Sequence, residues 1–270
     1  IVTDPGISKI AAVVPMASSA GDALSALAKV GGDLRAALSK LPPPQENFAR
    51  LLLVRHGESV ANHSGQLCGG AFDAQLNAQG QAQAEQLARE LARVGSLDFE
   101  VVGSSSLSRA VSSADAIARL FPRAARVALT ELREMDYGTL EGVKMAEVRN
   151  EIGDAARRWR AGETGLRIGG VGGESPEDVV GRVLPSIREL LHSRRGRTVL
   201  LVCHSHVNKA LIASVVPGLG LARLHEVPQR NCAVNILDFD CDALDKKKST
   251  APFRVLGINL SAASEERARL

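Results

Sequence analysis

The sequence predicts an α/β fold of three layers, in which helices cover both faces of a mostly parallel, doubly wound sheet. Three observations support this fold class. Short apolar runs such as Leu51-Leu52-Leu53-Val54 are typical of strands that are buried on both faces. These runs alternate along the chain with segments of helical periodicity. A length of 270 residues and a hydrophobic content of 45% are sufficient for a large globular domain.

The first half of this domain is predicted to contain three strands and two helices. After the strand at 51–54 comes a polar loop with glycine, and the next strand, at 99–102, ends at a glycine and three serines. Residues 126–130 are the third predicted strand. Helices are expected at 77–94 and 110–120, where apolar residues recur at helical spacing. In the first of these helices they are Ala84, Leu87, Ala88 and Leu91.

The second half continues the alternation. Its predicted helices are 145–160, 175–192 and 208–216, and its predicted strands are 198–203, 231–239 and 253–258. The start of the helix at 175–192 is clear, because Ser175 can cap it and Pro176 fits the first helical position. A glycine-rich, irregular segment at 162–173 precedes it. The last two strands flank a lysine-rich turn, and we expect them to form an antiparallel edge of the sheet.

An extension precedes the domain. We divide the chain into an N-terminal helical extension at 1–47, a domain at 48–260 and a C-terminal tail at 261–270. Leucines recur at helical spacing between Asp22 and Leu41, and three prolines then end the predicted helix. Two interpretations stay open: an arm packed on its own domain, or a helix that docks on a protein partner or on a second copy of the chain.

Composition narrows the possible partners and the compartment. The net charge of +3 comes without a long basic stripe, so we expect no nucleic acid partner. We also expect no membrane span, since no apolar run approaches the required length. Four irregularly spaced cysteines favour reduced thiols in a soluble protein of the cytoplasm or of an organelle matrix, a plastid included. The chain begins at Ile1, which is expected of a trimmed product or of a mature chain that has lost a targeting peptide.

Chemically active side chains follow four of the predicted strands. Ligands of an open α/β sheet bind just beyond the carboxyl ends of its strands. Arg55 and His56 follow the first strand, Arg109 follows the second, Glu134 the third and His204 the fourth. Each residue alone has an ordinary structural explanation, but their joint placement at one edge predicts a common site.

This set of side chains suits a phosphate ester. Two guanidinium groups can hold phosphoryl oxygens through paired hydrogen bonds. A neutral imidazole can attack phosphorus and form a phosphohistidine, while the second imidazole holds the transferring oxygens. A protonated carboxyl group can give its proton to the leaving alkoxide. The sequence therefore predicts phosphoryl chemistry on a small phosphorylated substrate.

Several motifs in family order resemble the histidine phosphatase superfamily, which includes the cofactor-dependent phosphoglycerate mutases. They are Leu53-Val54-Arg55-His56-Gly57-Glu58-Ser59, Ser106-Leu107-Ser108-Arg109-Ala110, Leu132-Arg133-Glu134, Gly173-Glu174-Ser175 and Val202-Cys203-His204. The resemblance implies that His56 accepts the phosphoryl group and that Glu134 donates the proton. It also implies a phosphate pocket of Arg55, Arg109 and His204, with Asn62 beside the phosphate. It implies no metal ion and no organic cofactor.

The sequence departs from the family pattern at two places. Ser205-His206 stands where many members have a glycine after the second histidine, so we expect Ser205 to offer a hydroxyl to the phosphate and His206 to point away. The segment at 62–73 also lacks an arginine that many members place there, which leaves the contacts of the substrate's second polar group open.

The resemblance does not decide whether the protein is a mutase or a phosphatase. The 70 positions between Glu134 and His204 are few for the insertion that closes a mutase site against water. We therefore expect a phosphatase rather than a mutase. Two further alternatives are a metal-dependent hydrolase that uses His204 and His206, and an assembly subunit that retains a phosphatase fold.

Overall fold

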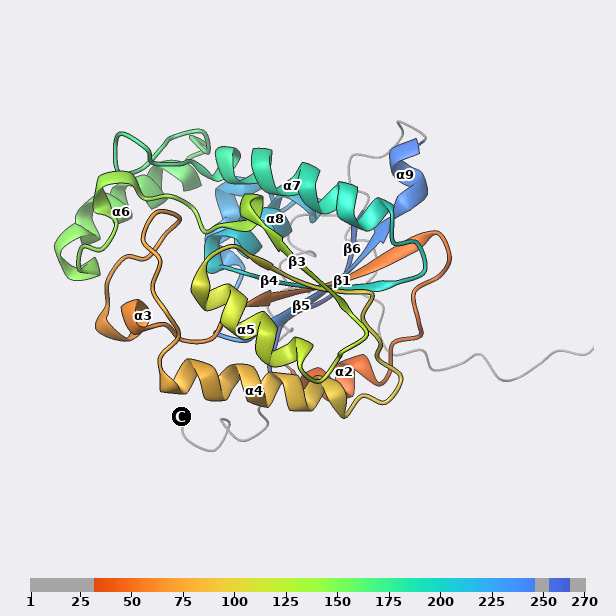
Figure 1. The fold of residues 1–270 in the computed structure, drawn as a ribbon. Coiled ribbons are helices and arrows are strands. Elements are labelled where there is room, and N and C mark those ends of the chain that lie inside the picture. Colours follow the sequence, from red (N-terminus) through yellow and green to blue (C-terminus); the bar gives the residue numbers. More distant parts are fainter. Residues whose placement is uncertain (1–31, 246–252, 263–270) are drawn as a thin grey trace, which may run out of the picture.

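A single mixed sheet forms the centre of the molecule. The computed structural model describes residues 32–245 and 253–262. Six strands lie in the order β3-β2-β4-β1-β5-β6 (Figure 1). Their bounds are β1 (Phe48–Arg55), β2 (Val101–Ser105), β3 (Ala125–Leu129), β4 (Thr198–Cys203), β5 (Val234–Asp240) and β6 (Phe253–Leu260). The first four strands pair in parallel, whereas β5 runs antiparallel to β1 and β6 antiparallel to β5.

Helices cover both faces of this sheet (Figure 1). The α-helices are α2 (Leu34–Leu38), α3 (Val60–Ser64), α4 (Ala78–Ala92), α5 (Ser108–Ala118), α6 (Met145–Arg160), α7 (Pro176–His192), α8 (Ser205–Val215) and α9 (Cys241–Asp245). Short 3-10 helices are η1 (Thr130–Leu132), η2 (Gly138–Leu140) and η3 (Leu221–Glu226). Helices α2, α4 and α5 lie on one face, and α7 and α8 lie on the other. The predicted fold class is confirmed.

Strand β1 shows why its sequence is almost continuously apolar. Successive side chains of a strand point to opposite faces. Leu51 and Leu53 accordingly pack in the core beneath α7 and α8, while Leu52 and Val54 pack in the core beneath α4 and α5. All four side chains are fully buried. Burial on both faces makes β1 a rigid support for the residues at its carboxyl end.

The helix predicted at 22–41 is only partly visible, since residues 22–31 lie outside the described part of the chain. Within the described part the helix is α2, which begins after the capping residue Asp33 and ends at Leu38, before the predicted limit. Leu34 and Leu38 are buried in the same core cluster as the apolar side chains of α4. This part of the extension packs on its own domain.

Several predicted boundaries were wrong, including those of β2, predicted at 99–102, and the starts of β1, β5 and α8. Strand β1 begins at Phe48 instead of at Leu51, because Arg50 pairs with Asp238 of β5 through two hydrogen bonds of 2.8 and 3.0 Å. Strand β5 begins at Val234 instead of 231, since Cys232 has a φ of 54°. Helix α8 begins at Ser205, immediately after β4, instead of at 208. In the described ranges, no helix combines the length and apolar character that a membrane crossing requires.

Candidate active site

The carboxyl ends of β1 and β4 bring the two predicted histidines face to face. Arg55 is paired in register with Cys203, so the residues that follow them, His56 and His204, leave neighbouring strands side by side. Their ring centroids lie 5.1 Å apart, with 59° between the ring planes. Residues far apart in the sequence therefore meet at one edge of the sheet, as the sequence predicted.

His56 is held as a neutral imidazole with one nitrogen free to react. Its Nδ1 lies 2.6 Å from the carbonyl oxygen of Gly57, and a carbonyl can only accept, so Nδ1 carries the proton. The lone pair is consequently on Nε2. Burial, together with the positive charges of Arg109 and Arg55, lowers the pKa of His56 well below its usual value. His56 can therefore act as a nucleophile without first losing a proton.

His204 caps the start of α8 from a fully buried position. In the part of the chain that the structure describes, neither of its ring nitrogens has a hydrogen-bond partner. Burial, followed by the charges of Arg109, His56 and Arg55, lowers its pKa well below the usual value. A buried polar group without a partner costs about 1–3 kcal/mol. A ligand that hydrogen-bonds to this ring would remove that cost.

Arg109 reaches the site from the first turn of α5. Its side chain is almost fully buried, yet it donates to backbone carbonyls: Nη2 to Gly69 over 2.9 Å and Nη1 to Phe72 over 3.3 Å. The carboxylate of Asp73 approaches Nη1 to 3.6 Å. The loop before α4 thus orients the guanidinium group through two carbonyls and an ion pair with Asp73.

Arg55 supplies the second guanidinium group. Its Nη1 donates to the carbonyl oxygen of Gln229 over 2.8 Å, while its Nε is buried without a partner among the described residues. Burial lowers the pKa of Arg55, and the nearby charge of Glu134 opposes this shift. Arg55, Arg109, His56 and Glu134 therefore lie within electrostatic reach of one another.

Glu134 lies against the N-terminus of α8. Its Oε1 accepts hydrogen bonds from the backbone N–H groups of Met135, over 2.9 Å, and Val207, over 3.2 Å. Its Oε2 accepts from the backbone N–H of His206 over 3.2 Å. The side chain is only 6% exposed. These contacts fix the carboxyl group beside the end of the helix that His204 begins.

The remaining predicted residues are placed less centrally. Asn62 is exposed, and its Oδ1 accepts from the backbone N–H of Ser59 in the capping box of α3. Ser205 is the half-buried first residue of α8. The Nδ1 of His206 lies 2.8 Å from the hydroxyl of Tyr137, and burial lowers the pKa of His206 to about 4. Of the two histidines considered as metal ligands, His206 thus contacts Tyr137, whereas the ring nitrogens of His204 have no hydrogen-bond partner among the described residues.

The sequence analysis missed several residues that support the backbone around the site. The Oγ of Ser113 accepts from the backbone N–H of Gly57 over 3.1 Å and donates to the carbonyl of Arg109 over 2.8 Å. It therefore ties the loop that follows His56 to helix α5, which carries Arg109. Its position one turn after Arg109 was the only signal in the sequence. A buried amide network of Asn208, Gln229 and Asn235 supports the backbone that holds Arg55.

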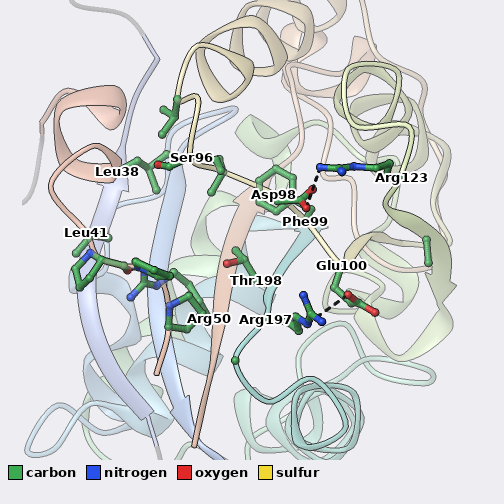
Figure 2. A pocket seen from close by; sticks show the side chains of 17 residues that line it. Leu38, Leu41, Arg50, Ser96, Asp98, Phe99, Glu100, Arg123, Arg197 and Thr198 are labelled. Atoms are coloured by element: carbon green, nitrogen blue, oxygen red, sulfur yellow. Dashed lines mark hydrogen bonds and ion pairs between the residues drawn. The ribbon is translucent and has the colours of Figure 1, made fainter. Parts of the chain in front are cut away.

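A separate pocket of about 480 Å³ lies at the opposite edge of the sheet (Figure 2). It is lined near the starts of β1 and β4 by Arg50 and Thr198. Figure 2 shows that its exposed charges are paired, Arg123 with Asp98 and Arg197 with Glu100. It is therefore distinct from the site of the two histidines. Across residues 32–245 and 253–262, no group of three or more His, Cys, Asp or Glu side chains is arranged to hold a metal ion.

The doubly wound sheet, with paired histidines and arginines at its carboxyl edge, is the arrangement of a phosphate-binding α/β protein. Residues 51–249 match the histidine phosphatase superfamily (branch 1), and the chain belongs to this superfamily.

Curated relatives in this superfamily include both phosphatases and mutases. The chain is 30% identical over 195 residues to a probable 2-carboxy-D-arabinitol-1-phosphatase of Arabidopsis thaliana, covering 72% of this chain and 39% of that protein. It is 34% identical over 173 residues to a 2,3-bisphosphoglycerate-dependent phosphoglycerate mutase of Rhizobium etli, covering 61% and 78%. The chain thus spans about two fifths of the length of the plant phosphatase that it matches.

A solved structure supports the same relationship. The fold resembles that of a mycobacterial glucosyl-3-phosphoglycerate phosphatase with a TM-score of 0.65 and 26% sequence identity. The similarity covers 79% of this chain and all of that one.

Proposed function

We propose that this chain hydrolyses a phosphate monoester of a small metabolite through a phosphohistidine on His56. The observation that carries the proposal is the concentration of buried polar atoms without protein partners, among the described residues, at the ends of β1 and β4. They are the Nε of Arg55 and both ring nitrogens of His204. An oxyanion is the ligand that would satisfy both groups at once.

The reaction follows from these side chains in two balanced steps. Nε2 of His56 attacks phosphorus, so a P–N bond forms while the bond from phosphorus to the ester oxygen breaks. Glu134 must be protonated as this step begins, with a proton taken from solvent when the negatively charged ester binds, and it gives that proton to the leaving alkoxide. Water then attacks the phosphohistidine, Glu134 takes up the proton, and the P–N bond breaks to release inorganic phosphate. Arg55, Arg109 and His204 hold the three phosphoryl oxygens in both steps.

Relatives support hydrolysis and leave the substrate open. A 2-carboxy-D-arabinitol-1-phosphatase and a glucosyl-3-phosphoglycerate phosphatase both carry phosphatase activity in their names. A mutase reaction is the second candidate, favoured by the 34% identity to a phosphoglycerate mutase. The choice depends on whether water or a second substrate oxygen accepts the phosphoryl group from His56.

The decisive experiment compares the wild-type protein with His56→Ala on an aryl phosphate. We expect the wild type to release phosphate and His56→Ala to lose at least about a thousandfold in kcat, as removal of a covalent nucleophile does. Labelled phosphate trapped on the wild type should be acid-labile. Normal turnover by His56→Ala, or an acid-stable label, would refute the covalent route. With 3-phosphoglycerate, the ratio of inorganic phosphate to 2-phosphoglycerate distinguishes phosphatase from mutase.

A further inference from the structure

Lys209 lies on the face of α8 that leads back to the two histidines. It follows Ser205 by one helical turn, and residues four apart share a face of a helix. Helical side chains lean toward the N-terminus of their helix. The N-terminus of α8 holds His204 and receives the carboxyl group of Glu134. The long side chain of Lys209 is therefore directed toward the rim of the site.

Lys209 is half-buried and lies within electrostatic reach of one positive and one negative side chain. Burial, followed by the charge of Arg55, lowers the pKa of Lys209, and the charge of Glu134 opposes this shift. Glu134 is already engaged by three backbone N–H groups. Within the described ranges no carboxylate forms an ion pair with Lys209. Half-burying an ammonium group without a partner is unfavourable, so this position suits a residue that binds an anion.

Helix η3 lies between Lys209 and a further arginine, Arg160 of α6. Helix η3 packs against both α8 and α6. His225 of η3 lies within electrostatic reach of Lys209 and of Arg160, the last residue of α6. The acidic neighbour Glu226 pairs with Arg223 through hydrogen bonds of 2.9 and 3.1 Å. Burial, followed by the charge of Arg160, lowers the pKa of His225, so the positive groups on this side of Arg55 are Lys209 and Arg160.

We propose that Lys209 binds a second anionic oxygen group of the substrate, while Arg55 and Arg109 hold the phosphoryl group that is transferred. This inference rests on the proposed function and narrows its substrate class to phosphate monoesters that carry a carboxylate or a second phosphate. A compact, flexible ammonium group can accept either anion as a point charge.

The test compares esters that differ only in the second group. 3-Phosphoglycerate supplies a carboxylate, glycerol 1,3-bisphosphate a second phosphate, and sn-glycerol 3-phosphate a hydroxyl group. The quantity measured is the ratio of kcat/KM for each anionic ester to kcat/KM for glycerol 3-phosphate. Lys209→Met should lower at least one ratio about tenfold or more, because a charge-assisted contact is lost. The ratio that falls identifies the anion.

Two variants serve as controls. Lys209→Arg retains the charge and should keep the ratio within about threefold of the wild type. Lys40→Met removes an exposed lysine beside α2 and should leave the ratio unchanged. Both ratios unchanged within twofold in Lys209→Met would overturn the proposal.

A binding measurement separates this inference from the proposed chemistry. Calorimetry with the same three ligands on His56→Ala needs no turnover. Lys209→Met in that background should weaken binding of the favoured anionic ester about tenfold relative to glycerol 3-phosphate. Equal weakening of all three ligands would overturn the subsite. If only the proposed covalent route were wrong, His56→Ala would instead retain turnover.

Discussion

The substitution Gly57→Ala tests how closely the nucleophile depends on its support. Gly57 packs against Gly80 at the start of α4, where a Cβ on Gly57 would lie 2.3 Å from the carbonyl oxygen of Gly80 and 2.9 Å from its carbonyl carbon. Ordinary contact begins at 3.4 Å, so the two backbones must separate by about 1 Å. The carbonyl of Gly57 holds Nδ1 of His56, and its N–H donates to Ser113. The displacement therefore passes directly to His56.

A shift of about 1 Å in a reacting group can cost about a hundredfold in rate. Overpacking of this kind costs about 1–3 kcal/mol in stability. We expect Gly57→Ala to lower kcat/KM for an aryl phosphate about a hundredfold. We also expect it to lower the free energy of unfolding by about 1–3 kcal/mol. Steady-state phosphate release measures the first quantity, and urea denaturation followed by circular dichroism measures the second.

Gly181→Ala is the matched control. Gly181 lies inside α7, where an added Cβ meets nothing within 4 Å, and alanine favours helix over glycine by about 1 kcal/mol. This variant should keep full activity and gain stability. If Gly57→Ala kept kcat/KM within about threefold of the wild type, the close packing of Gly57 on Gly80 would not position His56.

Three further predictions concern Glu134, His206 and the N-terminal extension. Glu134→Gln should lose about 10²–10⁴-fold in kcat/KM on an alkyl phosphate but far less on an aryl phosphate, whose leaving group needs no proton; equal losses would contradict the role of Glu134. The pKa of His206 is about 4 in the folded chain and about 6.5 in the unfolded chain. Below pH 6.5 the unfolded chain therefore binds a proton that the folded chain does not bind, and the free energy of unfolding falls as the pH drops. His206→Gln should remove up to about 1.4 kcal/mol per pH unit of that fall between pH 6.5 and 5 in urea denaturation, and an identical slope in both proteins would refute this. Leu34→Ala should lower the free energy of unfolding by about 2–5 kcal/mol with kcat unchanged, whereas a loss below about 1 kcal/mol would contradict the packing of α2 on the domain.

The positions of the principal site residues were predictable because they depend on local features of the sequence. Arg55, His56 and His204 each follow an apolar run, and strands formed by such runs end at a common edge. Arg109 was predictable from its place at the start of a helix after the second strand. In each case the sheet sets the position, and the apolar pattern determines the sheet.

Other features depend on distant contacts that no local pattern reveals. Arg50 lies in β1, although its charge argues against a buried strand, because Asp238 meets it from the other end of the chain. The carbonyls that hold Arg109 belong to Gly69 and Phe72, in a loop without periodicity. Among the described residues Lys209 likewise forms no ion pair, and the nearby Glu134 instead accepts hydrogen bonds from three backbone N–H groups.

The guanidinium groups of half-buried Arg55 and buried Arg109 make the stability of the folded chain depend on the anion of the buffer. Sulfate, phosphate or vanadate that binds only the folded chain stabilises it by mass action, by about 2.7 kcal/mol at a hundred times the dissociation constant. Under the proposed function, the same anions compete with the phosphate ester for Arg55 and Arg109. Thermal scans in phosphate would therefore report a higher melting temperature than scans in an amine buffer. Activity assays in phosphate would report a lower rate.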